Sequence, residues 1–325
     1  MHKSWKLAGA LALMAATIAV AAPKVVKSQG TPTVRIDGSS TVFPISEAVA
    51  EEFQAAEGGR TRVTVGISGT GGGFKKFCSD NPSVRTDISD ASRPIKQKEI
   101  DACKAQGIEF IELPVAYDAI TVVVDKNNGV NSMTVAELKK IWSKSSQGSV
   151  TKWSDVRSGW PAAQFTLFGP GADSGTFDYF KEVILGKGND MRTDFTPSED
   201  DNVLVQGIAG NPTALGYFGL AYYEANKGRL KAVAIDGGNG PVSPSEATVN
   251  NGSYKPLSRP VYIYVNKQAV ANKPHVKRFV EFYLQNAARL AKEVNYVALP
   301  GPDYQSAMRR FQGGQTGRVP LRQGL

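Results

Sequence analysis

The chain has 325 residues, of which 41% are hydrophobic and 21% charged, and its 38 Lys and Arg against 30 Asp and Glu give a formal net charge of +8 at pH 7. This length and balance describe a globular protein with a substantial core, in one large or two ordinary domains. The positive charges are scattered and form no basic run typical of nucleic-acid binding, although a basic exterior can attract anions. No nucleic-acid partner is therefore expected.

Residues 1–22 have the pattern of a secretory signal peptide. Lys3 and Lys6 precede an apolar run over residues 7–20, and residues 19–21, Ala-Val-Ala, match a cleavage site. The alternative is an uncleaved anchor, but the run is short for a bilayer span and no later segment is long enough. Export is therefore predicted, and loss of the two lysines, with no acid in the segment, would leave a net charge of +6.

From residue 33 onward, short β-type runs alternate with helical patterns, which predicts an α/β sheet. The first strand, 33–36, leads through a Gly/Ser/Thr turn into a helix that continues to residue 56. Ser40 and Thr41 lie where N-cap oxygens are wanted, and Pro44 fits the first helical turn. Further strands are expected over residues 62–65, 108–113, 119–124, 164–168, 214–218, 232–235 and 260–265, and further helices over 74–79, 96–106, 134–142, 176–185, 198–208, 276–291 and 304–311.

Three strand-to-helix junctions are rich in glycine and hydroxyl residues, at 36–47, 66–75 and 169–177. A helix N-terminus with free N–H groups and flanking hydroxyls is a ready anion site. An ordinary capped helix explains the first junction equally well, and an ordinary tight turn explains the second. Because the pattern occurs three times, we expect the junctions to converge on one oxyanion.

Two crossings, at 114–118 and 256–260, have the character of hinges. They divide the chain into a lobe I of residues 33–115 with 262–325 and a lobe II of residues 119–257. The tail from residue 313 to 325 is basic and glycine-rich, and we expect it to be disordered.

The two cysteines, Cys78 and Cys103, allow two interpretations. In an exported protein the pair is consistent with one disulfide, and two buried thiols are the alternative. The sequence leaves both open.

The sequence contains only weak matches to the motifs of catalytic, nucleotide-binding and metal sites. The glycines at 69 and 71–73 match neither phosphate-binding nucleotide motif, and Ser174 is not in a G-x-S-x-G elbow. After the signal segment the chain has one histidine, His275, which with two separated cysteines makes no zinc pattern. The acidic run 199–201 is more simply a helix start than a carboxylate pair. We therefore expect no enzyme activity, cofactor or metal.

Six segments, at 37–44, 66–77, 90–95, 113–118, 171–177 and 214–219, together resemble the PstS/SphX-type phosphate-binding proteins, the receptors of phosphate ABC transporters. The resemblance covers most of residues 33–312. It implies a two-lobed α/β periplasmic binding protein, type II-like, with the ligand cleft between lobes joined by a two-segment hinge. It also implies a monomeric extracytoplasmic receptor with inorganic phosphate and the membrane permease subunits as partners.

The resemblance also implies where phosphate binds. Neutral donors suit a buried dianion held by hydrogen bonds, and the backbone N–H of Val42 or Phe43 could contribute. The positions that match the family's three loops are Ser40, Thr41, Thr70, Ser174, Gly175 and Thr176.

Two positions depart from the pattern. Some relatives carry an aspartate where this chain has Ser92, and it accepts the phosphate proton and so rejects sulfate. They also carry an arginine where this chain has Pro170. Our hypothesis is that Arg93 supplies the guanidinium and that Asp173 pairs with it or accepts the ligand proton. The alternatives are a surface arginine and a simple N-cap.

Three other functions remain possible from the sequence: a receptor for another tetrahedral oxyanion such as sulfate or molybdate, an exported phosphoester hydrolase using Ser174 or Thr41, and a phosphate sensor without transport. The scarcity of histidine and metal ligands counts against the hydrolase.

Overall fold

The computed structural model describes residues 30–172, 174–198 and 200–319. The residues from 31 onward form one compact unit. The predicted signal peptide lies outside the described residues. Within them, no helix combines the length and the apolar character that a bilayer crossing requires.

The strands alternate with helices along the chain, as expected. The strands are β1 (Thr33–Gly38), β2 (Arg62–Ile67), β3 (Ile88–Ala91), β4 (Phe110–Asp125), β5 (Ser132–Thr134), β6 (Thr166–Gly169), β7 (Thr196–Pro197), β8 (Ala214–Gly219), β9 (Leu230–Ala232), β10 (Ala234–Asp236), β11 (Pro241–Val242) and β12 (Ser258–Asn266). The helices are α1 (Phe43–Ala56), α2 (Gly69–Phe77), α3 (Gln97–Ala105), α4 (Val135–Trp142), α5 (Trp153–Val156), α6 (Gly175–Phe180), α7 (Asp201–Ile208), α8 (Leu220–Asn226), α9 (Glu246–Asn250), α10 (Lys267–Asn272), α11 (Pro274–Glu293) and α12 (Gly301–Gln312). Short helical segments η1 (Lys144–Ser146) and η2 (Lys181–Leu185) complete the set, and η2 continues α6.

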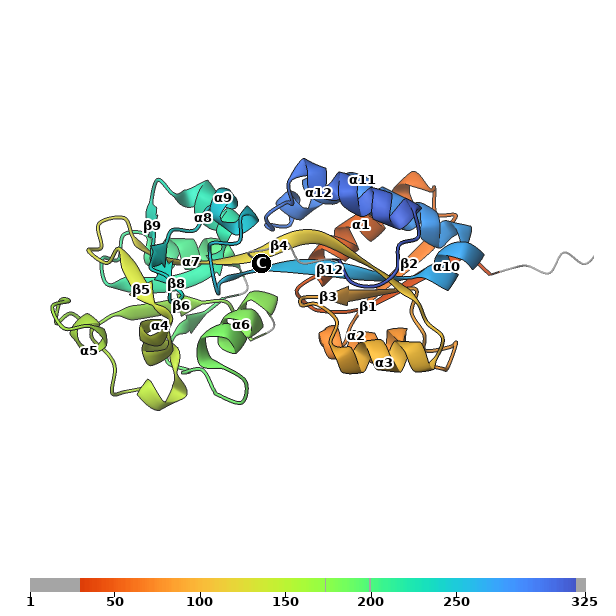
Figure 1. Cartoon of the computed structure of the whole chain (residues 1–325). Helices are drawn as coiled ribbons and strands as arrows, with labels where there is room; N and C mark the ends of the chain where they lie inside the picture. The colour runs from red at the N-terminus through yellow and green to blue at the C-terminus, as the bar shows by residue number, and fades with distance from the viewer. Residues whose placement is uncertain (1–29, 173, 199, 320–325) are drawn as a thin grey trace, which may run out of the picture. The chain divides into compact units, whose positions relative to one another are not determined.

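A long sheet runs through both lobes in the order β2-β1-β3-β12-β4-β8-β6-β7, with β9 beside β4. The pairs of β1 with β2 and β3 are parallel, as are those of β6 with β7 and β8, whereas β12 and β4 are antiparallel to their neighbours. Figure 1 shows α1, α11 and α12 on one face of the lobe I sheet and α2 and α3 on the other. A three-stranded sheet, β11-β10-β5, belongs to lobe II.

The two lobes share β4 and β12. β4 pairs with β12 up to Ala119 and with β8 from Ile120, so one strand serves both lobes. The strands predicted at 108–113 and 119–124 are one continuous strand of 16 residues, and the hinge at 114–118 stays a prediction. Pro114 has no N–H to donate, and it is accommodated by a register shift opposite Val261 and Tyr262. The exact lobe boundaries stay a prediction.

The first helix forms as its sequence predicts. Ile45, Val49 and Phe53 lie on one buried face of α1. Phe53 packs edge-on against Phe279 of α11, with ring centroids 5.2 Å apart. This spacing of apolar residues at three to four positions is what buries one face of a helix. Contacts of this kind hold the turn before α1 at the C-terminal end of β1.

The second helix begins earlier than predicted, at Gly69 instead of residue 74. Gly73 explains the difference, because a Cβ there would lie 2.6 Å from the Cα of Gly38 and 2.9 Å from the Asp37 carbonyl oxygen. Glycine is normally unfavourable in a helix. Here its missing side chain lets α2 approach β1 closely enough to bring its N-terminus beside the β1–α1 turn.

The C-terminal tail is ordered as far as it is described, contrary to expectation. Arg310 donates to the Thr316, Gly317 and Arg318 carbonyls at 2.5–3.2 Å. The Gly317 N–H bonds the Phe110 carbonyl at 2.8 Å, and the Val319 N–H bonds Glu112 at 2.7 Å. The tail therefore lies against β4 up to residue 319, and residues 320–325 are outside the described range.

The structure joins Cys78 to Cys103 in a disulfide. The bond ties the end of α2 to α3, and both cysteines are buried with Phe74, Phe77 and other apolar side chains. Of the two interpretations, the structure has the disulfide.

Removing this bond is expected to destabilise the protein by about 3 kcal/mol. A link across 25 positions restricts the unfolded chain by about that amount in the loop-entropy description. Urea denaturation of the doubly substituted C78S/C103S protein, compared with the oxidised wild type, measures the change. A loss below about 0.5 kcal/mol would contradict the expectation.

Candidate functional site

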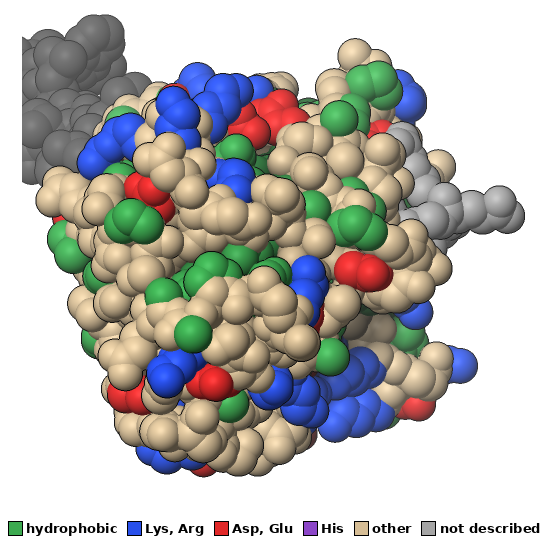
Figure 2. All heavy atoms as spheres, turned by 90° about the vertical axis from the view of Figure 1, so that its left-hand side faces the viewer, with side chains coloured by type: hydrophobic (Ala, Val, Ile, Leu, Met, Phe, Trp, Pro, Cys, Tyr) green, Lys and Arg blue, Asp and Glu red, His purple; other side chains and the backbone are tan. Residues whose placement is uncertain are grey.

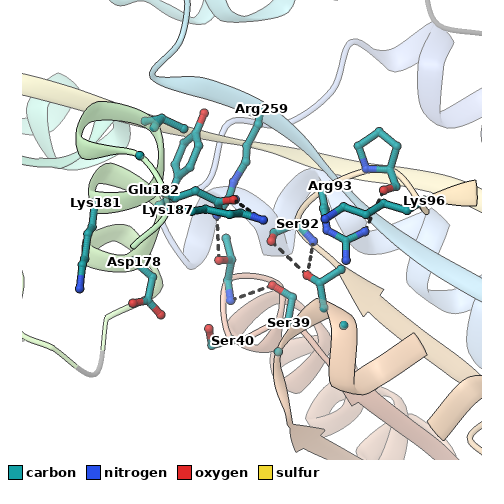
Figure 3. Close-up of a pocket in the computed structure, with 18 of the residues that line it drawn as sticks. Ser39, Ser40, Ser92, Arg93, Lys96, Asp178, Lys181, Glu182, Lys187 and Arg259 are labelled. Carbon is teal, nitrogen blue, oxygen red and sulfur yellow. Dashed lines mark hydrogen bonds and ion pairs between the residues drawn. The ribbon is translucent and has the colours of Figure 1, made fainter. Parts of the chain in front are cut away.

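A cavity of about 710 Å³ lies where the two lobes face each other. Lobe I contributes residues 39–41, 69–71, 92–94 and Lys96, and lobe II contributes residues 178, 179, 181–183 and 186–188. Arg259 and Pro260 of β12 also line it. Figure 3 shows these side chains converging from the loops before α1 and α2 and from the segment formed by α6 and η2.

The turn before α1 supplies Ser39, Ser40 and Thr41. The Thr41 N–H donates to the Ser39 hydroxyl at 3.2 Å, and the Tyr296 hydroxyl donates to the Thr41 carbonyl. We expected Ser40 or Thr41 to cap the helix, but the N-cap position is Val42 and no side chain caps it. The N–H groups of Val42 and Phe43 donate to the Ser39 carbonyl at 3.1 and 3.0 Å, so they are already engaged. The turn is thus a fixed platform with its hydroxyls facing the cavity.

Thr70 and Ser92 meet, although 22 positions separate them. Their hydroxyl oxygens are 3.2 Å apart, and the Ser92 N–H donates to the Thr70 hydroxyl at 3.2 Å. The close packing of α2 on β1 produces this contact. Two of the predicted positions are therefore adjacent in the cavity.

Arg93 lines the cavity but has a strong internal partner. Its two terminal nitrogens lie 2.9 and 2.8 Å from the two carboxylate oxygens of Glu99, and one of them also donates to the Pro94 carbonyl at 3.1 Å. Burial acts to raise the pKa of Glu99, but the hydrogen bonds from Arg93 and from the Lys96 N–H outweigh it and lower that pKa. Glu99 therefore neutralises much of the positive charge of Arg93, which we had predicted would face the ligand.

The third junction reaches the first. The Ser174 hydroxyl caps α6 by accepting from the Thr176 N–H at 3.2 Å. A Cβ on Gly175 would lie 3.0 Å from the Thr41 hydroxyl oxygen. Residues 174–176 do not line the cavity themselves, but Gly175 is in contact with a residue that does. Asp173 lies outside the described residues, so its predicted role stays a prediction.

Sequence reasoning missed Arg259. Its Nη2 donates to the Thr41 hydroxyl at 3.1 Å, and its Nε and Nη2 both lie 3.3 Å from one oxygen of Asp118. Its Cζ is 3.7 Å from the centre of the Tyr179 ring. The available signal was its place in the predicted hinge, because a hinge residue lies at the floor of an interlobe cleft.

The electrostatics of the cavity favour anions. The pKa of Lys96 is lowered by the positive charge of Arg93 and then by that of Lys187, which belongs to the opposite lobe. Burial raises the pKa of Asp118, and Arg259 opposes that effect. On the face of the molecule in Figure 2, by contrast, Lys and Arg lie in several separate groups with acids between them. The cations that matter for a ligand are those gathered in the cleft.

The arrangement offers hydroxyl groups and guanidinium groups, and the carboxylates of Asp178 and Glu182 also line the cavity. No histidine is found among the described residues that line the cavity. The described residues also contain no group of His, Cys, Asp and Glu that could hold a metal ion. The hydroxyl and guanidinium groups can donate hydrogen bonds to an oxyanion.

Comparison with known proteins gives consistent results. The model of the PBP superfamily domain matches residues 25–287. The chain is 54% identical to Protein SphX of Synechococcus elongatus over 88% of this chain and 83% of the relative. It is 37% identical to the phosphate-binding protein PstS of Staphylococcus saprophyticus over 93% and 92%.

A solved structure from Planctomyces limnophilus, described as a possible phosphate binding protein, is 46% identical and superposes with a TM-score of 0.81 over 88% of this chain and 99% of that one. A phosphate transport receptor from Vibrio cholerae, 21% identical with a TM-score of 0.64 over 82% and 100%, shares the fold. The chain belongs to the PBP superfamily and, within it, to the family of the SphX and PstS phosphate-binding proteins.

Proposed function

We propose that the protein binds inorganic phosphate outside the cytoplasm and delivers it to the membrane permease of an ABC transporter. The observation that carries the proposal is the meeting of Thr41, Thr70 and Ser92, with Arg259, around one cleft between two lobes. The names of the relatives support phosphate in particular. So does a 26% identical structure from Clostridium perfringens, described as a putative phosphate ABC transporter substrate-binding protein with bound phosphate, which superposes with a TM-score of 0.55 over 82% of this chain.

The binding set we propose comes from four segments. Hydroxyl and N–H donors surround the ligand without adding net charge, and the arginines balance part of its dianionic charge. The proposed contacts are Ser40, Thr41, Thr70, Ser92, Arg93, Asp173, Ser174, Gly175 and Thr176.

The proposed role is non-catalytic. The PstS relative is named as a phosphate-binding protein and the Planctomyces limnophilus structure as a possible one, and the hydroxyl and guanidinium groups of the cleft suit hydrogen-bond donation to a bound anion. The proposed location outside the cytoplasm is based on the predicted signal peptide. The proposed monomeric state and permease contact are based on membership of the family. Closure of lobes I and II about β4 and β12 would enclose the ligand.

Selectivity against sulfate requires a proton acceptor. Hydrogen phosphate can donate a hydrogen bond, whereas sulfate cannot, and an unmatched buried acceptor costs about 1–3 kcal/mol. Asp173 is the acceptor that we propose.

Calorimetric titration of the ligand-stripped protein with phosphate and then sulfate, at mildly alkaline pH, tests the proposal. We expect tight one-to-one phosphate binding and no heat from sulfate. Comparable binding of both anions would indicate a general oxyanion receptor. Binding of neither would reject the proposed function and leave the family membership describing the fold alone.

A further inference from the structure

Arg259 lies at the meeting point of three parts of the protein. It belongs to β12, it bonds Thr41 in the turn before α1, and it stacks on Tyr179 of α6. Its position opposite Asp118 is set by the antiparallel register of β12 and β4. In Figure 3 its side chain extends from the strand toward the cavity, between the helix that carries Asp178 and the loop that carries Ser92.

The two arginines of the cleft differ in how closely their charge is paired. Arg93 faces both oxygens of Glu99 at 2.8–2.9 Å, which is the geometry of a close bidentate pair. Arg259 meets only one oxygen of Asp118, at 3.3 Å. Its Nη1 has no hydrogen-bond partner among the described residues, yet its side chain is only 17% exposed and lines the cavity. Each arginine uses three of its five N–H groups within the described residues. The charge of Arg259 is less closely neutralised than that of Arg93, and both hydrogens of its Nη1 remain for a ligand.

The surroundings of Arg259 hold it in place before any ligand arrives. The Asp118 side chain is 8% exposed, so moving the guanidinium away would leave a buried carboxylate without its counter-charge. The ring of Tyr179 supports the flat face of the guanidinium, a contact that desolvation strengthens. A donor that is fixed in advance loses little conformational entropy when it binds.

Arg259 also determines what Thr41 can do. A threonine hydroxyl has one donor hydrogen and two acceptor positions. Because the Thr41 oxygen accepts from Arg259, its own hydrogen remains to be donated, and no acceptor for it is found within the described part of the chain. The arginine thus turns the Thr41 hydroxyl into a donor for an anion.

From these contacts we propose that Arg259, and not Arg93, supplies the main guanidinium contact to the bound tetrahedral oxyanion and orients the Thr41 hydroxyl toward it. This inference rests on the proposed function, because it assigns the charge and donor set of the same cleft. It predicts that the energetic effects of Arg259 and Thr41 on binding are coupled, whereas those of Arg93 and Thr41 are independent.

The experiment is a calorimetric comparison of the wild type with R259Q, R259K, R93Q and the matched control R157Q, each titrated with phosphate, sulfate and molybdate. Arg157 suits the control because it has the same kinds of partner away from the cavity: the Glu137 carboxylate at 2.6 Å and the Trp160 ring, 4.3 Å from its Cζ. We expect R259Q to weaken phosphate binding at least 100-fold, R93Q less than tenfold and R157Q less than threefold. Thermal melts without ligand confirm that each variant is folded.

R259K covers the case in which R259Q does not fold. The lysine ammonium keeps the positive charge but cannot contact Asp118, Thr41 and the anion at the same time. We therefore expect R259K to bind phosphate at least tenfold more weakly than the wild type. T41V and R259Q/T41V then test the coupling: the double variant should lose much less affinity than the product of the two single losses. Additive losses would show that Arg259 does not orient the Thr41 hydroxyl toward the anion.

Three outcomes are distinguishable. If the wild type binds phosphate and R259Q or R259K binds within threefold of it, the inference is wrong while the proposed function stands. If the wild type binds sulfate or molybdate but not phosphate, the proposed function is wrong, and loss of that anion in the Arg259 variants still supports the inference. If the wild type binds none of the three, both are wrong.

Discussion

Replacing Asp90 with asparagine is expected to remove one source of pH dependence from the protein's stability. In the wild type, this residue lowers the free energy of unfolding by about 1.4 kcal/mol for each unit that the pH rises. Asp90 lies in β3 and is 1% exposed. Neither oxygen of its carboxyl group has a hydrogen-bond partner among the described residues. The residue is therefore a buried acid in poorly compensating surroundings.

Burial raises the pKa of Asp90 from its ordinary value of 3.8 to about 8. The nearby Ser46 hydroxyl acts to lower that pKa, and the Asp37 carboxylate acts to raise it. An isolated charge in this environment would be costly, so the folded protein holds the carboxyl group in its neutral form.

The direction of the pH effect follows from proton binding. Between about pH 3.8 and pH 8 the folded state keeps the Asp90 proton, whereas the unfolded state has released it. The folded state binds more protons, so the free energy of unfolding falls as the pH rises through this window. Asparagine has a similar shape and no proton to take up, so the variant lacks this contribution.

Urea denaturation at pH 5.5, 6.5 and 7.5 measures the effect as the difference between the variant and the wild type. The difference is needed because burial also raises the pKa values of Glu112 and Asp118, which act in the same direction and remain in both proteins. D80N, a change at an exposed position, is the control and should leave the slope unchanged. Parallel curves for D90N and the wild type would show that Asp90 is ionised in the folded protein.

Local patterns in the sequence were sufficient to locate the strand-to-helix junctions. Thr41 and Thr70 each follow a parallel strand, and the carboxyl ends of such strands meet at one edge of a sheet. Their lining of one cavity was therefore predictable from hydrophobic periodicity and turn residues. Ser92 was placed with them by the family resemblance and is in direct contact with Thr70.

Arg259 was not predictable in this way, because its contacts are long-range. It bonds Thr41 across 218 positions and Asp118 across 141. The register of two antiparallel strands brings these residues together, and no local pattern encodes that register. The same limit explains α2: a run of glycines suggests a turn, and only the close approach of Gly73 to Gly38 shows why it is helical.

The tail was misjudged for a related reason. Its composition is typical of disordered segments. However, Arg310 donates hydrogen bonds to three of the tail's carbonyl groups, and β4 pairs with the tail. Composition alone does not include these contacts.

Gly175 provides the second large expected effect: G175A should weaken phosphate binding roughly tenfold or more with little change in thermal stability. The added Cβ would lie 3.0, 3.1 and 3.2 Å from the hydroxyl oxygen, Cα and N of Thr41. Gly175 belongs to lobe II and Thr41 to lobe I, so the methyl group would separate the two lobes where they must close on the ligand. A loss of about 1.4 kcal/mol of closure energy corresponds to tenfold in affinity.

The folded lobes themselves should tolerate the change. Gly175 is the first residue of α6, where alanine has a higher helix propensity than glycine. Its conformation is not one of the positive-φ glycine conformations found elsewhere in the chain. The cost should therefore fall on ligand binding and not on folding.

Phosphate titration and thermal melts with and without phosphate test this expectation against G228A. A Cβ on Gly228, also in lobe II, would meet no atom within 4 Å, so that variant should match the wild type in both measurements. A G175A protein that melts normally without phosphate, but gains little melting temperature from it, would place the loss in ligand binding and not in folding. If G175A binds phosphate as tightly as G228A, the turn before α1 yields to the methyl group, and Thr41 does not hold the rigid position from which its role as a donor was inferred.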